Sequence, residues 1–146
     1  MFLDKVAETE YKDCLNIWEL SVRATHNFLS EEDINYFKPL ILNEFLPAVQ
    51  LYCIKNKNSK IIGFMGVADR KVEMLFVLPD YFRQGIGTKL MQYALDELDI
   101  NSVDVNEQND SAFIFYRKLG FKVIERSEVD DMGKPYPILH LKVSTF

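Results

Sequence analysis

Apolar side chains recur every three or four residues in several stretches of this chain, which is the spacing of an amphipathic helix. The first such stretch runs from Tyr11 to Thr25. A second opens at Ser30, because Ser30 and Asp33 resemble a capping box with Asp in place of the usual Glu. Pro39 is expected to kink or divide this second helix, since proline lacks the backbone N–H that a helix interior needs.

Two more helices are predicted in the second half of the chain. One follows a pair of glycines and carries apolar residues from Leu90 to Leu98. The other begins near Asp110, a residue type that caps helices, and ends before Gly120, because glycine suits the left-handed conformation found at helix ends.

The apolar period shortens to that of β-strands between these helices. Strands are expected at residues 49–56, 60–69, 71–78, 102–105, 121–129 and 138–143. A further strand is expected before the first helix. The order of elements predicts an α/β fold of the α+β type, in which about six to seven strands form one mixed, mostly antiparallel sheet with about four helices on its faces.

Length and composition place the chain among folded globular proteins. Its 146 residues suit one domain, residues 1–146, and 48% of them are apolar. Such a chain can bury a core without disulfides or a structural metal. Cys14 and Cys53 lie far apart in sequence and are expected to be reduced thiols within that core.

The charge balance narrows the classes of partner. A net charge of −5, from 17 basic and 22 acidic residues, argues against a surface that binds the phosphate backbone of nucleic acid. The start of the chain is acidic and lacks the basic region and long apolar core of a signal peptide. No apolar run approaches the roughly 20 residues that span a bilayer. We therefore expect a cytoplasmic protein without nucleic-acid or membrane partners.

The stretch LFVLPDYFRQGIGTKL, at residues 75–90, joins a predicted strand to a predicted helix through Gly85 and Gly87. A Gly-rich turn that opens a helix presents unpaired backbone amides at the positive end of the helix dipole, which suits a phosphate group. A dinucleotide fingerprint would need a third glycine where Leu90 stands, and a Walker A loop would need a different spacing. The spacing alone leaves two interpretations, an anion site and a tight strand-to-helix turn.

A second motif, NDSAFIFYRKLGF at residues 109–121, follows the first along the chain. Together the two motifs resemble the acetyl-CoA-binding core of the GNAT acetyltransferase superfamily, and the predicted element order fits that fold over nearly the whole chain. The resemblance implies a GNAT-like sheet. It also implies an enzyme that uses acetyl-CoA as cosubstrate and transfers its acetyl group to a primary amine.

The resemblance further implies which residues bind the cofactor. Backbone amides of the Gly-rich turn would hold the pyrophosphate. The strand that ends at residues 76 and 77 would splay from the strand near Val105, which leaves backbone groups free for the pantetheine arm. The residues implied are Phe76, Val77, Arg83, Gln84, Gly85, Ile86, Gly87, Thr88, Lys89 and Asn109. Phe82 departs from the family pattern, since Arg or Gln usually stands there, so we expect altered or weakened cofactor affinity.

Tyr116 and Glu73 are the catalytic residues that the resemblance implies. Tyr116 matches a tyrosine near the cofactor sulfur, and a phenol with a reference pKa of about 10 can protonate a thiolate whose parent thiol has a pKa near 8.5. Glu73 matches an acid that receives the proton of the amine through water. The residues themselves leave other roles open, a half-buried helix aromatic for Tyr116 and a solvated or ion-paired side chain for Glu73.

Three residues are implied in acceptor binding. His26 follows the first helix, where the family builds one wall of its acceptor pocket. Asp130 and Tyr136 lie in the turn-rich connection between the last two strands. His26 could instead be a structural, hydrogen-bonded residue of its loop, and Asp130 could simply form part of a turn. His140 lies in an apolar strand and is expected to be structural, and two isolated histidines predict no metal site.

Direct transfer in a ternary complex is the expected mechanism, because Cys14 and Cys53 fall in core-like patterns and offer no covalent nucleophile. The acceptor is expected to be either a protein lysine or N-terminus, or a small polyamine or drug. The competing interpretation is an acyl-CoA sensor that binds the cofactor without turnover. We expect a monomer or a homodimer.

Overall fold

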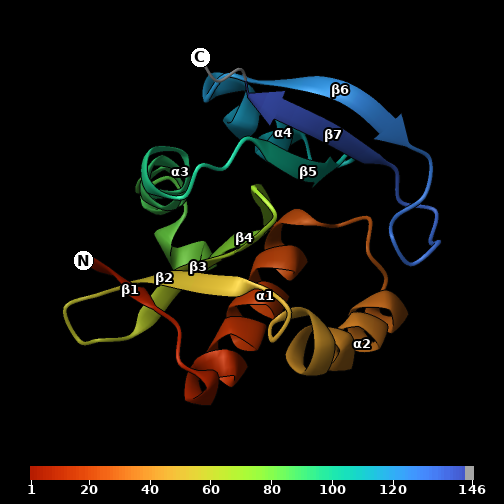
Figure 1. Ribbon diagram of the computed structural model, residues 1–146. Coiled ribbons are helices and arrows are strands. Elements are labelled where there is room, and N and C mark those ends of the chain that lie inside the picture. The colour runs from red at the N-terminus through yellow and green to blue at the C-terminus, as the bar shows by residue number, and fades with distance from the viewer. Residues whose placement is uncertain (144–146) are drawn as a thin grey trace.

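The computed structural model describes residues 1–143, which form a seven-stranded sheet flanked by four α-helices (Figure 1). The strands are β1 (Phe2–Lys5), β2 (Gln50–Lys55), β3 (Ile61–Ala68), β4 (Lys71–Val77), β5 (Ser102–Asn106), β6 (Phe121–Ser127) and β7 (Ile138–Val143). The α-helices are α1 (Tyr11–Thr25), α2 (Glu31–Leu40), α3 (Ile86–Glu97) and α4 (Asp110–Lys118). None of the helices in this part of the chain is long and apolar enough to cross a membrane.

The strands follow the order β1-β2-β3-β4-β5-β7-β6 across the sheet. Every pair of neighbours is antiparallel except β4 and β5, which are parallel. The prediction of a mixed, mostly antiparallel sheet with helices on its faces is confirmed. Because β7 lies between β5 and β6, three segments that are separate in sequence meet at one end of the sheet (Figure 1).

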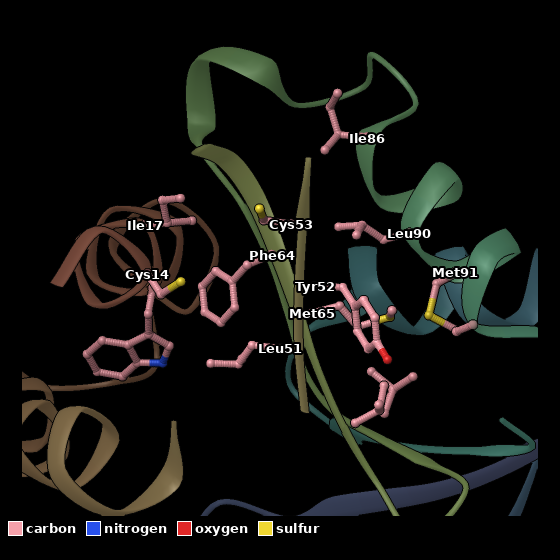
Figure 2. Close-up of a cluster of buried hydrophobic side chains, with 14 of the residues drawn as sticks. Cys14, Ile17, Leu51, Tyr52, Cys53, Phe64, Met65, Ile86, Leu90 and Met91 are labelled. Carbon is pink, nitrogen blue, oxygen red and sulfur yellow. The ribbon is translucent and has the colours of Figure 1, made fainter. Parts of the chain in front are cut away.

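The core has two layers, one on each face of the sheet (Figure 2). The register of β2 and β3 pairs Cys53 with Phe64 and Tyr52 with Met65. Since side chains alternate along a strand, the first pair faces α1 and the second faces α3. Cys14 of α1 joins the first layer, and both cysteines are buried free thiols, as predicted.

Two helix starts differ in detail from the sequence expectation. Asn109 caps α4 in place of Asp110, because its Oδ1 accepts the backbone N–H of Ala112 at 3.2 Å. The capping box at the start of α2 is half formed. Ser30 Oγ accepts the backbone N–H of Asp33 at 3.1 Å, but the Asp33 carboxylate turns toward the connection between β6 and β7.

Pro39 divides the second helical segment, as predicted. The α-helix α2 ends at Leu40, and a π-helical turn, Ile41–Phe45, follows at once. The last turn of this segment is closed by a bond from the Leu46 N–H to the Ile41 carbonyl oxygen at 2.9 Å. A proline that lacks a backbone donor thus coincides with a change of helix type.

Candidate active site

The strands β4 and β5 are paired at only two positions, the second of which joins Val72 to Val103. Beyond that point β4 continues to Val77 along β3, and β5 continues to Asn106 along β7. The predicted splay is therefore present. Within residues 1–143, the edge of β4 that faces β5 has no strand partner near Phe76 and Val77, and such an edge can pair with an added extended segment.

Glu73 lies in a β-bulge of β4. Gly66 of β3 pairs with Met74 and Val67 pairs with Val72, which leaves Glu73 as the extra residue between them. A bulge re-aims the side chain that it carries, and bulges are common next to active sites. The bulge lies where β4 and β5 begin to separate.

The electrostatic surroundings of Glu73 favour its protonated form. Partial desolvation raises the pKa of the Glu73 carboxyl, and the nearby carboxylates of Asp104 and Asp131 raise it further. The Lys71 ammonium acts in the opposite direction without cancelling these effects. A carboxylate whose pKa is raised binds a proton more readily near neutral pH, which suits a general base.

The helix α3 begins without a side-chain cap. Gly85 is its N-cap residue and has φ of +82°, and the first turn contains no acidic side chain. The Lys89 N–H is bonded to the Gly85 carbonyl oxygen at 2.9 Å, so the amides of residues 86–88 precede the helical ladder. Backbone amides at the positive end of a helix dipole form a suitable cradle for pyrophosphate.

The turn before Gly85 has an unusual backbone conformation. Arg83 has φ of +62°, a left-handed conformation that is uncommon outside glycine. The Gln84 side-chain Nε2 donates to the Asp80 carbonyl oxygen at 3.1 Å. Gln84 thus stabilises the turn with its side chain, and its predicted contact with the phosphate stays a prediction.

Asn109 and His26 form a buried pair that links α4 to the end of α1. Asn109 Oδ1 is used by the Ala112 N–H, so its amide Nδ2 donates to His26 Nε2 at 3.4 Å. The Thr25 hydroxyl donates to the Ser21 carbonyl oxygen at 2.8 Å, so its oxygen accepts from His26 Nδ1, also at 2.8 Å. This network assigns the neutral tautomer with its proton on Nδ1.

The surroundings of His26 agree with that tautomer. Burial lowers the pKa of His26 to about 4, so the ring is uncharged at neutral pH. Both ring nitrogens and both amide atoms of Asn109 are occupied within the protein. The hydrogen-bonded interpretation of His26 and the capping interpretation of Asn109 are therefore present in the structure, while their predicted acceptor and cofactor contacts stay predictions.

Tyr116 is a buried residue of α4. Its ring lies against Phe115 and Phe121, with centroids 5.1 and 5.8 Å away. No group within residues 1–143 forms a hydrogen bond with its hydroxyl, and the residue as a whole is 6% exposed. Burial raises the pKa of the Tyr116 phenol, which keeps it protonated at neutral pH.

The connection between β6 and β7 contacts α2 through a hydrogen bond and an ion pair. The Tyr136 hydroxyl donates to the Asp33 carboxylate, and Lys134 Nζ lies 3.0 Å from Asp33 Oδ1. The Lys134 ammonium also lies over the ring of Tyr36, 4.5 Å from its centroid. The Tyr136 hydroxyl and Lys134 lower the pKa of Asp33, so the carboxylate is ionised. The capping-box interpretation would pair the Asp33 side chain with the backbone N–H of Ser30, and it did not predict the contact with Tyr136 and Lys134.

Asp130 stabilises the β6–β7 connection through hydrogen bonds inside it. Its Oδ1 accepts the backbone N–H groups of Met132 and Lys134, each at 2.9 Å. The turn interpretation of Asp130 is thus present in the structure. Its recognition of a cationic acceptor stays a prediction.

The predicted site residues fall into two groups that contact each other. The cofactor group lies at the free edge of β4, the start of α3 and the start of α4. The acceptor group lies in the α1–α2 and β6–β7 connections. A chain of side chains joins them, because Asn109 bonds His26, the His26 ring lies 5.2 Å from Phe28, and Phe28 lies 5.6 Å from Tyr136.

The cysteines are unsuited to covalent catalysis. Burial raises the pKa of Cys14 to about 12 and that of Cys53 to about 11, so neither forms a thiolate readily. In the part of the chain that the structure describes, no group of three or more His, Cys, Asp or Glu side chains is arranged to hold a metal ion.

Comparison with known proteins identifies the family. The model of the acetyltransferase (GNAT) domain matches residues 47–123. The chain is 42% identical to peptidyl-lysine N-acetyltransferase YjaB of Escherichia coli strain K12 over 132 residues, which covers 90% of this chain and 89% of YjaB. The chain belongs to the GNAT acetyltransferase superfamily. It is an acetyl-CoA-dependent N-acetyltransferase.

Solved structures support the same assignment. The solution structure of apo-form YjaB from Escherichia coli matches the whole of this acetyltransferase with a TM-score of 0.89 and 38% identity, and each chain covers 100% of the other. The fold also matches PaiA N-acetyltransferase from Thermoplasma acidophilum, with a TM-score of 0.69, 24% identity and coverage of 97% and 99%. That crystal structure is a complex with coenzyme A.

Proposed function

We propose that this acetyltransferase modifies the ε-amino group of lysine residues in proteins, by direct transfer from acetyl-CoA in a ternary complex. The lysine acceptor is supported by the 42% identity to YjaB, which is named a peptidyl-lysine N-acetyltransferase. Direct transfer is supported by the burial and raised pKa values of Cys14 and Cys53, the two thiols of the chain.

Tyr116 is the proposed general acid, and its hydroxyl is the observation that carries the mechanism. The phenol is protonated at neutral pH, and its hydroxyl has no hydrogen-bond partner within residues 1–143. The helix that carries it, α4, packs against β5, one of the two splayed strands. A phenol so placed can protonate a thiolate as it departs.

Glu73 is the proposed general base. An amine attacks only when it is neutral, so the site must first accept a proton from the lysine ammonium or from the attacking amine. Glu73 projects from the bulge where β4 and β5 separate, and its raised pKa suits it to hold that proton. Water between the amine and this exposed carboxylate would relay the proton.

The cofactor residues are proposed to act mainly through their backbone. Acetyl-CoA supplies the activated acetyl group when it is bound. The amides of residues 84–88 would hold the pyrophosphate, with the charges of Arg83 and Lys89 nearby, because the Lys89 N–H is already bonded to the Gly85 carbonyl oxygen. The free edge of β4 at Phe76 and Val77 would bond the pantetheine arm as if it were another strand. An unpaired amide on the same edge would favour the negative charge that develops on the thioester oxygen.

The acceptor would enter between the α1–α2 connection and the β6–β7 connection, past Phe28 and Tyr136. Carboxylates of this region favour a cationic acceptor, and the net charge of −5 acts in the same direction over a longer range. His26 would form part of the inner wall rather than contact the amine through a free nitrogen. The cytoplasmic location and the monomeric or homodimeric state stay predictions.

The test of the proposal is a thiol-release assay with acetyl-CoA and a panel of acceptors. Lysine-containing peptides should release free coenzyme A and gain one acetyl group by mass spectrometry, and spermidine and aminoglycosides should react far more slowly. Reaction of the small amines alone would overturn the lysine acceptor. Cofactor binding without transfer to any acceptor would support a sensor instead.

Substitution of Tyr116 tests the proposed acid. Tyr116→Phe should lower kcat about 100-fold, since general acid catalysis contributes about that much. The KM for acetyl-CoA should stay nearly unchanged because the ring is kept. Tyr93→Phe, which removes a phenol from the neighbouring helix α3, is the matched control and should turn over normally. Undiminished kcat in a well-folded Tyr116→Phe enzyme would refute the assignment.

A further inference from the structure

Three polar side chains from three strands form a hydrogen-bonded line at one end of the sheet. Ser127 Oγ of β6 lies 2.7 Å from His140 Nε2 of β7, and His140 Nδ1 lies 2.7 Å from Asp104 Oδ1 of β5. The residues are brought together by the strand order β5-β7-β6, in which Asp104 lies directly opposite His140. Ser127 and His140 take no part in the proposed acetyl-transfer chemistry, whereas the Asp104 carboxylate also helps to raise the pKa of Glu73.

The chemistry of the groups fixes the direction of the bond between His140 and Asp104. A carboxylate can only accept, so His140 Nδ1 carries a proton and donates it to Asp104. When the ring is neutral, Nε2 has a free electron pair that accepts the Ser127 hydroxyl proton. The other Asp104 oxygen is held by Lys71 Nζ at 2.5 Å, which fixes the carboxylate toward His140. A hydroxyl, a base within hydrogen-bond reach and a group that orients the base form the arrangement of an activated nucleophile.

The line lies on the open face of this end of the sheet. Val103, Val105 and Leu141 alternate with the line residues along β5 and β7 and are buried on the opposite face. The side chains of Asp104 and His140 are 23% and 24% exposed. Ser127 is also partly exposed and ends β6, the last strand in the sheet order.

We propose that Ser127, His140 and Asp104 form a second, serine-dependent acyl site that takes activated acyl esters and hydrolyses them. Ser127 Oγ attacks the carbonyl carbon of the ester while His140 Nε2 takes the hydroxyl proton, and the bond from carbonyl carbon to alkoxide or phenolate breaks. His140 passes this proton to the departing oxygen or to solvent. Water then attacks the acyl-serine through the same base, which releases the carboxylic acid and restores the Ser127 hydroxyl.

A fluorophosphonate probe and 4-nitrophenyl acetate test this site without acetyl-CoA. The Ser127 oxygen should displace fluoride from the probe and give one adduct, which peptide mass spectrometry should locate on Ser127. Ser127→Ala should abolish the adduct. His140→Gln should slow both labelling and release of 4-nitrophenolate about 100-fold, the contribution expected of a general base. Asp104→Asn should slow both at least 10-fold, since the ring loses the group that orients it.

Ser102→Ala is the matched control, because Ser102 lies on β5 without a histidine partner and its hydroxyl is 3.5 Å from the Arg70 carbonyl oxygen. This variant should be labelled at the rate of the original protein. Circular dichroism and acetyl-CoA binding verify that each variant is folded. Absence of an adduct on Ser127 in the folded original protein would overturn the proposal. Equal labelling rates in the original protein and His140→Gln would also overturn it.

Discussion

At the scale of single residues, the buried pair of His26 and Asn109 stands out because it lies between the cofactor group and the acceptor group. Each side chain completes the hydrogen bonding of the other, and Asn109 also caps α4. Removal of one partner leaves a buried donor or acceptor unsatisfied, which costs about 1–3 kcal/mol. The pair therefore ties the stability of the fold to the arrangement of the site.

The lowered pKa of His26 makes the stability of the protein depend on pH. The ring has a pKa of about 4 when folded and an ordinary value near 6.5 when unfolded. Between these values the unfolded chain binds a proton that the folded chain does not, so the free energy of unfolding falls as the pH drops. The loss attributable to His26 should reach about 3 kcal/mol and should level off below pH 4.

Urea denaturation at pH 7 and at pH 4.5 measures this effect. His26→Gln should lose stability at pH 7 but should show a smaller fall between the two values, because glutamine does not titrate. His140→Gln, which removes the other histidine, should keep the fall that His26 causes. Parallel stability curves for the original protein and His26→Gln would contradict the assignment of a neutral His26.

At the scale of elements, the two glycines at the start of α3 can be compared for two requirements. Glycine can be needed for its backbone conformation or for the space that a side chain would fill. A Cβ on Gly85 would meet nothing within 4 Å, but the residue has φ of +82°. A Cβ on Gly87 would lie 3.5 Å from the Phe115 ring, which is ordinary contact, and Gly87 has helical backbone. The two glycines of the motif thus serve different purposes.

A pair of alanine variants distinguishes these purposes. Gly85→Ala should lose about 1 kcal/mol, the cost of left-handed backbone for an ordinary residue. Gly87→Ala should gain up to about 1 kcal/mol, since alanine favours a helix over glycine. Urea denaturation measures both, and calorimetry with coenzyme A measures whether either added methyl group obstructs the phosphate site. Equal destabilisation by the two substitutions would contradict this division.

The contact of α2 with the β6–β7 connection should control acceptor binding. Asp33→Asn removes the charge that holds Tyr136 and Lys134, so the connection should exchange its amide hydrogens faster. The KM for a lysine peptide should rise several-fold, while the KM for acetyl-CoA should change little. Glu32→Gln, which alters an exposed neighbour of Asp33 on α2, is the control. If the KM for the lysine peptide were unchanged in Asp33→Asn, the β6–β7 connection would not be part of the acceptor site.

At the scale of the whole molecule, the strand pairing between the two halves of the sheet in residues 1–143 is limited to the short pairing of β4 with β5. A ligand that bonds to the free edge of β4 and to α3 should stabilise the folded state. At 100 times its Kd, such a ligand adds about 2.7 kcal/mol, and Tm should rise by about 5–10 °C. A thermal scan with saturating acetyl-CoA measures the shift. An unchanged Tm would contradict cofactor binding at this site.

Much of this architecture is predictable from the sequence because it depends on local pattern. Helix α1 occupies its predicted residues, Tyr11–Thr25, since apolar spacing alone decides it. The bulge at Glu73 and the left-handed Arg83 are not visible in that pattern, because they depend on how β4 meets β3 and β5. Local turn chemistry likewise could not show that Asn109, rather than Asp110, would cap α4.

The contacts between distant residues could not be predicted from spacing. Asn109 and His26 are 83 residues apart, and His140 meets Asp104 across 36 residues. An isolated histidine in an apolar strand gives no sign of the strand that will lie beside it. The family resemblance drew attention to Tyr116 and the Gly-rich turn, whose predicted roles stay predictions, but it carried no information on the line from Ser127 to Asp104.

The separation of β4 from β5 should also affect how quickly proteases degrade the enzyme in a cell. A sheet that lacks one backbone partner at its centre is most resistant to proteases when its cosubstrate fills that place. The lifetime of the enzyme should then lengthen when acetyl-CoA is plentiful and shorten in starvation. The supply of the acetyl donor would regulate how much catalyst persists as well as how fast each molecule works.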